Sequence, residues 1–165
     1  MASTTGSGAA VVTLPSDTRI LVTREFAAPR HLVWRAFTTP DLVERWWSGG
    51  KGEITLVEMD LRVGGRWRHV LRTDDGTEVG FHGEYREVVA PQRVVCTEVY
   101  EGIPEGEDEP ALCTYVFSEA DGRTTLTLAI DMSSKEGRDA MLASGMETGM
   151  QAQYDLLEEL ARSLR

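Results

Sequence analysis

The sequence predicts an α+β domain in which a curved antiparallel sheet wraps around one long C-terminal helix. Strand-like segments, about seven of them, follow one another with turn residues between them. Two short helical segments come after the first strand, and the C-terminal residues repeat their apolar side chains with a helical period. A run of strands with helices at both ends is typical of the α+β class.

The first strand and the two short helices occupy residues 19–47. Residues 19–26 form the strand, and Pro29 then starts a helix that runs to Phe37. Thr39-Pro40-Asp41 starts the second helix, which carries Trp46 and Trp47 and ends at the glycines of residues 49–52. Adjacent residues on a short helix do not both point inward, so we expect only one of these tryptophans in the core.

Turn chemistry separates the remaining strands. We predict them at residues 53–61, 66–73, 77–89, 93–100, 111–118 and 124–131. The junctions contain Gly64-Gly65, Asp74-Asp75-Gly76, Ala90-Pro91 and Asp121-Gly122.

The hairpin around Gly76 can be registered from its sequence. A three-residue loop pairs Thr73 with Thr77, whereas a two-residue loop sets Trp67 against Glu84, so we reject the shorter loop. The accepted register gathers these side chains on the concave face: Trp67, His69, Leu71, Val79, Phe81 and Tyr85. His82 then lies beside Arg68 on the solvent face. The last hairpin stays open, with either Tyr115 and Phe117 or Thr114 and Val116 facing inward.

Two capping boxes divide the C-terminal segment into a short helix and a longer one. They are Ser133 with Glu136, and Ser144 with Glu147, so the long helix starts near Gly145. Its apolar stripe is Met146, Met150, Leu157, Leu160, Ala161 and Leu164, and its polar face is Glu147, Asp155, Glu158 and Glu159. Gly145 and Gly149 either let another backbone approach or leave room for a ligand.

Length and charge limit the domain count and the partners. We expect a single domain over residues 17–165 after a disordered lead-in at residues 1–16. The formal net charge of -10 argues against nucleic acid and anionic membranes as partners. With no apolar run long enough for a span and no signal-like N-terminus, we expect a cytoplasmic protein, as a monomer or a homodimer.

The sequence predicts neither a metal site nor a cofactor. His31, His69 and His82 are the only histidines, and none has ligand spacing to cysteines or acids. Cys96 and Cys113 fall on neighbouring strands, and in a reducing cytoplasm we expect two buried thiols rather than a disulfide.

Ligand-contacting residues are expected on the concave face and on the long helix. Aromatic walls with a few polar anchors are typical of small-molecule cavities. The candidates are Trp46, Trp67, His69, Phe81, Tyr85, Met146 and Met150. His69 and Tyr85 are the candidate polar anchors and, if chemistry occurs, the candidate acid-base pair, although each is also explained as a core residue.

The order of motifs resembles the SRPBCC superfamily, in its branch of activator of heat-shock-protein-90 ATPase homologue-like proteins, near the polyketide cyclase/dehydrase group. The resemblance covers residues 18–164 and rests on Arg24-Glu25-Phe26-Ala27-Ala28-Pro29, Trp46-Trp47, Gly64-Gly65-Arg66-Trp67, Gly83-Glu84-Tyr85-Arg86-Glu87-Val88 and Ser144-Gly145-Met146-Glu147. It implies a START-like helix-grip fold with a cavity for a hydrophobic or aromatic small molecule between sheet and helix.

Three hypotheses for function follow. The first is a small-molecule-binding protein that holds such a ligand in the cavity. The second is a cyclase/dehydrase-type enzyme that uses His69 with Tyr85 on a polyketide-like ligand. The third is a module that binds a chaperone through an exposed apolar surface.

Overall fold

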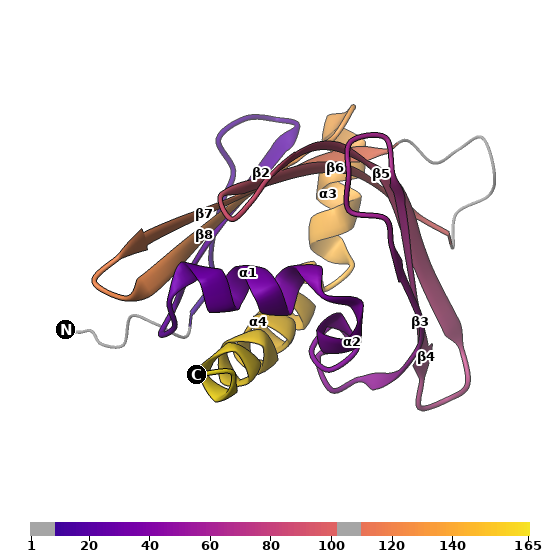
Figure 1. Cartoon of the computed structure of the whole chain (residues 1–165). Coiled ribbons are helices and arrows are strands. Elements are labelled where there is room, and N and C mark those ends of the chain that lie inside the picture. The colour runs from indigo at the N-terminus through magenta and orange to yellow at the C-terminus, as the bar shows by residue number, and fades with distance from the viewer. Residues whose placement is uncertain (1–8, 102–109) are drawn as a thin grey trace.

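The structure is a computed structural model that describes residues 9–101 and 110–165 (Figure 1). Its strands are β1 (Val11–Thr13), β2 (Arg19–Phe26), β3 (Gly52–Met59), β4 (Arg66–Thr73), β5 (Glu78–Val89), β6 (Arg93–Tyr100), β7 (Ala111–Ala120) and β8 (Arg123–Asp131). Its helices are α1 (Arg30–Thr38), α2 (Pro40–Val43), α3 (Lys135–Ala143) and α4 (Met146–Ser163).

The strands form one antiparallel sheet in the order β1-β2-β8-β7-β6-β5-β4-β3. The sheet curves over α1 and α4, which lie on its concave side (Figure 1). This arrangement confirms the predicted α+β class and the START-like architecture, with one strand more than the sequence indicated.

The additional strand is β1, and it corrects the prediction of a disordered lead-in for residues 11–13. This strand pairs with β2 through Val11, Val12 and Thr13. The pairing covers the outer edge of β2, which would otherwise present unpaired backbone groups. Residues 1–8 of the predicted lead-in lie outside the described part of the chain.

The register of the β4–β5 hairpin is the predicted one. Arg72 pairs with Glu78, His69 with Phe81, and Arg68 with His82. His82 lies on the solvent face, where its Nδ1 is 2.8 Å from Glu101 Oε2. The buried face of this hairpin is therefore the one that carries Trp67 and His69.

The last hairpin, which the sequence left open, has a two-residue turn. Ala120 pairs with Arg123, and Asp121 adopts a left-handed φ of 55°, as a type I′ turn requires. Phe117 is consequently buried, and its ring packs at 5.2 Å from the ring of Phe37 on α1.

A buried ion-pair network attaches α4 to the sheet. The Arg24 side chain on β2 is fully buried and donates to Asp155 at 2.9 Å and to Glu158 at 3.2 Å. Glu158 also accepts a hydrogen bond from the backbone N–H of Ala27 at 2.7 Å. The sequence placed both acids on the polar face of the long helix. Asp155 is 56% exposed there, whereas Glu158 is only 17% exposed, because the buried guanidinium of β2 needs counter-charges.

The helix termini differ from the two predicted capping boxes. Ser134, not Ser133, is the N-cap of α3, and its side chain accepts from the N–H of Gly137. Ser144 belongs to the end of α3, where its hydroxyl donates to the Met141 carbonyl. The N-cap of α4 is Gly145, with a left-handed φ of 86°.

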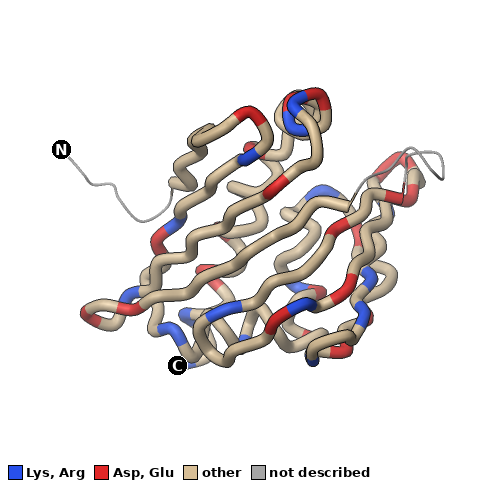
Figure 2. The backbone as a smooth tube through the Cα atoms, turned by 90° about the horizontal axis from the view of Figure 1, so that it is seen from above, with Lys and Arg blue, Asp and Glu red and all other residues tan. Residues whose placement is uncertain are grey.

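Charges on the surface are mixed. Figure 2 shows Lys and Arg residues interspersed with Asp and Glu along the strands. Among the helices described, none is both long and apolar enough to cross a membrane.

Candidate functional site

The candidate site is built from alternate residues of β4, β5 and β6. Because side chains alternate across a strand, the register puts Trp67 and His69 of β4 on the same face as Phe81 of β5 and Tyr100 of β6. This is the concave face, which the helices cover.

Aromatic rings surround His69. The centroids of Trp47 and Trp67 lie 5.2 Å and 4.9 Å from the imidazole centroid. Trp47 also packs edge-on against Phe81 at 5.3 Å, and Phe81 contacts Tyr100 at 5.3 Å. We call these five residues the aromatic cluster. It runs from the interior, where His69 is 6% exposed, to the surface, where Tyr100 is 42% exposed.

His69 carries an unsatisfied polar atom. Its Nδ1 is buried and has no hydrogen-bond partner within the described part of the chain. Burial lowers the pKa of His69 to about 4, and the nearby Arg68 carbonyl opposes this effect only in part. The imidazole is therefore neutral at physiological pH, and its Nδ1 needs a partner that the described residues do not supply.

The structure corrects the expectation that only one tryptophan of the Trp46-Trp47 pair contacts the core. Trp46 is buried, stacks on Phe37 and donates to the Ala36 carbonyl at 2.9 Å. Trp47 is half-buried and packs against His69. Both reach the interior because α2 ends at Val43 and the chain continues in turns. Trp47, rather than the predicted Trp46, thus joins the aromatic cluster.

Trp67 reaches across β5 to β6. Its indole N–H donates to the Thr97 carbonyl at 3.1 Å, and the strand between them contributes Gly83. A Cβ at residue 83 would overlap the Thr97 carbonyl and lie 2.5 Å from Trp67 Nε1. The absence of a side chain at Gly83 therefore lets the indole lie flat on the sheet.

Tyr85 is buried on the same face but away from His69. His69 pairs with Phe81, and Tyr85 lies four residues further along β5, beyond the row of Trp67. At about 3.3 Å per residue this separation is roughly 13 Å along the strand. Burial raises the pKa of Tyr85. The structure does not bring together the predicted acid-base pair.

Glu98 is an inward-facing acid that the sequence analysis missed. Burial raises the pKa of its carboxyl group, and its Oε2 lies 3.7 Å from the thiol of Cys113. None of the ion pairs found among the described residues includes Glu98. The alternation of the strand could have indicated this position. Val94, Cys96 and Glu98 are two residues apart in succession, so Glu98 faces the same side as the buried Val94 and Cys96.

Cys96 and Cys113 pair directly across β6 and β7, and both are free thiols. Burial raises the pKa of Cys96 to about 12 and that of Cys113 well above its usual value. Two protonated, enclosed thiols are poor nucleophiles and poor metal ligands. No group of His, Cys, Asp and Glu side chains in residues 9–101 and 110–165 is arranged to hold a metal ion.

The two methionines predicted to contact a ligand lie in the first half of α4. Met146 and Met150 of α4 are half-buried and pack against the hydrophobic core. A Cβ added at Gly149, between them, would meet no described atom within 4 Å, so no backbone approaches closely there. The sequence left two explanations for Gly149, close approach of another backbone or room for a ligand. The structure excludes the close approach of a described backbone segment.

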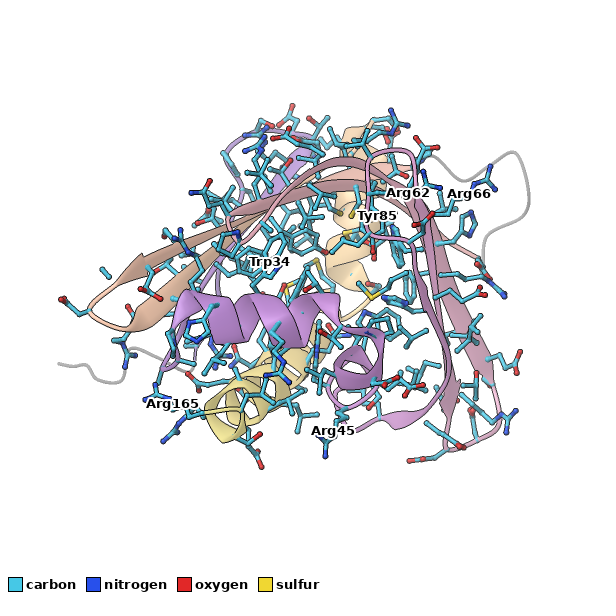
Figure 3. All side chains as sticks on the ribbon, viewed as in Figure 1. Trp34, Arg45, Arg62, Arg66, Tyr85 and Arg165 are labelled. Carbon is cyan, nitrogen blue, oxygen red and sulfur yellow. The ribbon has the colours of Figure 1, made fainter. Side chains whose placement is uncertain are left out.

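Side chains from several elements meet beneath the sheet. Figure 3 shows side chains from the sheet and the helices meeting there, Trp34 and Tyr85 among them. Two hollows have volumes of about 670 and 520 Å³, one around Glu158 and Arg162 near the end of α4, the other around Arg68, Glu101 and Trp67. Neither lies between α4 and the aromatic cluster, where the sequence predicted a cavity.

Comparison with known proteins identifies relatives over almost the whole chain. A family model described as "Activator of Hsp90 ATPase homolog 1-like protein" matches residues 27–162. No curated protein matches the chain.

Solved structures share the fold. A protein of Rhodobacter sphaeroides is 29% identical with a TM-score of 0.84, and the match covers 94% of this chain and 99% of that one. A Mycobacterium smegmatis protein is 27% identical with a TM-score of 0.82, covering 91% and 94%. A solution structure from Arthrobacter aurescens, 22% identical with a TM-score of 0.82 over 93% and 91% of the two chains, matches in fold alone.

Proposed function

The chain belongs to the family of Activator of Hsp90 ATPase homolog 1-like proteins, and from that premise we propose that it binds a hydrophobic or aromatic small molecule between α4 and the aromatic cluster. Proteins with this fold typically bind ligands or act as activators. The observation that carries the proposal is the buried Nδ1 of His69, which has no partner among the described residues and lies beside the rings of Trp47 and Trp67.

An unpaired buried polar atom is costly. Leaving one without a partner costs on the order of 1–3 kcal/mol, so a site that holds one needs a compensating role. A ligand that hydrogen-bonds Nδ1 recovers that cost only when it is bound. The rings of Trp47, Trp67 and Phe81 offer the flat apolar surface that such a ligand requires.

Access to His69 requires side chains to move, because His69 is only 6% exposed in the described conformation. The side chains at the outer end of the site are suited to such movement. Trp47, Phe81, Met146 and Met150 are all half-buried rather than enclosed. Methionine is flexible and repacks readily around irregular shapes, which supports its role as the adaptable side of the site.

Acid-base catalysis receives less support. At neutral pH an imidazole with a pKa of about 4 is not in the imidazolium form that serves as a general acid, and it is a weak base. The backbones of His69 and Tyr85 are also separated by about 13 Å along the sheet, at about 3.3 Å per residue. We therefore favour binding over a cyclase/dehydrase-type reaction.

Native mass spectrometry of the protein purified from its own host tests this proposal. We expect an adduct of small mass that disappears on denaturation and is less abundant in the variant His69→Phe but unchanged in His31→Phe, whose position on α1 is exposed. A bare wild-type chain that also gives no thermal shift with a panel of aromatic and lipid-like compounds contradicts the proposal. If a chaperone co-purifies with the protein in that case, the result favours the third hypothesis, in which the protein binds a chaperone.

A further inference from the structure

The polar groups of the concave face indicate what kind of ligand the site accepts. This inference rests on the proposed binding function and narrows its ligand class. Two ionisable side chains near the site, His69 on β4 and Glu98 on β6, face the interior, and burial favours the neutral form of each. An environment that disfavours charge on its own side chains also disfavours charge on a ligand.

Charge of either sign is unfavourable in this interior. A negative ligand would enter a protein of net charge -10 and would approach Glu98, which forms no ion pair among the described residues. The buried guanidinium of Arg24 is already paired with Asp155 and Glu158 and is not available to an acid. A positive ligand would lose its hydration beside a ring cluster that already keeps His69 uncharged.

The remaining requirement is a hydrogen-bonding group for Nδ1. In a neutral imidazole one nitrogen donates and the other accepts, and a hydroxyl group can serve either because it does both. Trp47 and Trp67 pack against His69, and Phe81 packs against Trp47, so these three rings would contact the body of the ligand.

We propose that the ligand is an uncharged aromatic alcohol or phenol, whose rings pack against Trp47, Trp67 and Phe81 and whose hydroxyl group hydrogen-bonds His69 Nδ1. Acids, amines and compounds without a hydroxyl group bind more weakly at this position. No covalent step is involved.

Isothermal titration calorimetry with four compounds that share one ring system tests the proposal at pH 7. The compounds are 2-naphthol, 2-methoxynaphthalene, 2-naphthoate and 2-naphthylmethylamine, which carry a hydroxyl, a methyl ether, a negative charge and a positive charge. We expect 2-naphthol to bind at least about tenfold more tightly than each of the others, because each of them leaves Nδ1 poorly paired or brings a charge into the interior.

The variant His69→Phe keeps an aromatic ring but removes the hydrogen-bonding Nδ1. We expect it to bind 2-naphthol and 2-methoxynaphthalene with equal affinity, while His31→Phe keeps the wild-type ratio. In the wild-type protein the ¹⁵N resonance of His69 Nδ1 should shift when 2-naphthol binds and stay in place with 2-methoxynaphthalene. This resonance reports the hydrogen bond directly, independently of the stability of any variant.

The outcomes separate this inference from the proposed function. If all four compounds bind equally, or the acid or the amine binds best, the hydroxyl inference is wrong while ligand binding stands. If 2-naphthol binds best but the His69 resonance does not move, the assigned contact is wrong. If no compound binds and no other aromatic or lipid-like ligand does, the proposed function itself fails.

Discussion

Arg24 and His69 are both basic side chains buried on the concave face, and they differ in their partners. Arg24 has two carboxylates within hydrogen-bonding distance and lies 5.0 Å from the Phe26 ring centroid. His69 Nδ1 has no partner among the described residues. The first arrangement stabilises the docking of α4, whereas the second costs stability, as binding and catalytic groups often do.

Replacing His69 should therefore stabilise the protein. The variant His69→Phe removes an unsatisfied polar atom and keeps a ring of similar shape, so we expect the free energy of unfolding to rise by about 1 kcal/mol. Urea denaturation at pH 7 measures this change, with His31→Phe as the control for an exposed histidine. A loss of stability in His69→Phe alone would mean that the imidazole is an ordinary core residue with a structural partner.

The same residue predicts a pH dependence. In the unfolded chain a histidine protonates near pH 6.5, but in the folded protein burial lowers the pKa of His69 to about 4. Between these two pH values the unfolded state binds the proton and the folded state does not. The free energy of unfolding therefore falls as the pH decreases from 6.5 to 4, and it stops falling on account of His69 once the pH is below about 4. The loss amounts to about 3 kcal/mol.

Other groups titrate in that range, so the difference between wild type and His69→Phe isolates the contribution of His69. Urea denaturation at several pH values should give curves that diverge below pH 6.5. Parallel curves would show that His69 titrates normally in the folded state.

The Arg24 network predicts a large effect of a single substitution. In Arg24→Met, Glu158 would stay mostly buried without a cation, and we expect a loss of about 3 kcal/mol in unfolding free energy. Arg19 on the same strand pairs with Asp131, but its side chain is 46% exposed, so Arg19→Met should cost less than about 1 kcal/mol. Equal losses in the two variants, measured by chemical denaturation, would contradict a special role for burial.

At the scale of elements, the α3–α4 junction shows how capping distinguishes neighbouring residues. Ser133 and Ser134 both precede α3, and only Ser134 accepts from a free N–H of the first turn, at 3.0 Å. We expect Ser134→Ala to lower the melting temperature, with a loss of about 1 kcal/mol, and Ser133→Ala to leave it unchanged. A larger loss in Ser133→Ala than in Ser134→Ala would support the capping box of Ser133 with Glu136 that the sequence predicted.

The two glycines at the start of α4 should respond oppositely to alanine. Gly145 has a left-handed φ of 86°, which alanine adopts only with strain, so Gly145→Ala should destabilise the protein. Gly149 is helical and a Cβ there meets no described atom, so Gly149→Ala should stabilise the protein by about 1 kcal/mol. Thermal denaturation of both variants measures the signs, and a destabilising Gly149→Ala would contradict the open space observed there.

At the scale of the whole molecule, β1 closes one edge of the sheet and connects it to α4. It pairs with β2, and the N–H of Ala10 just before it donates to Gln151 on α4 at 2.7 Å. Removal of residues 1–13 should leave the fold intact but cost about 2 kcal/mol, because several backbone hydrogen bonds are lost. Faster amide hydrogen exchange confined to β2 would confirm this view, whereas unchanged exchange would mean that β1 does not protect the edge.

The two hairpins illustrate how much of the site could be predicted. In β4–β5 only one loop length puts apolar side chains of both strands on the same face, so the sequence defined the register and the inward position of His69. In β7–β8 both faces of the strand contain apolar residues, and the choice of Tyr115 and Phe117 came from packing against Phe37.

The sequence by itself determined the α+β class, the bounds of most strands and the concave position of Trp67, His69 and Tyr85, because alternation and turn chemistry are local properties. The tertiary structure decided which of these residues meet. It placed Trp47 against His69, separated Tyr85 from it, turned Glu158 toward Arg24 and left Nδ1 of His69 without a partner among the residues that it describes. The reason is physical, since burial and hydrogen-bond satisfaction depend on contacts between residues distant in the chain, and no local pattern specifies those contacts.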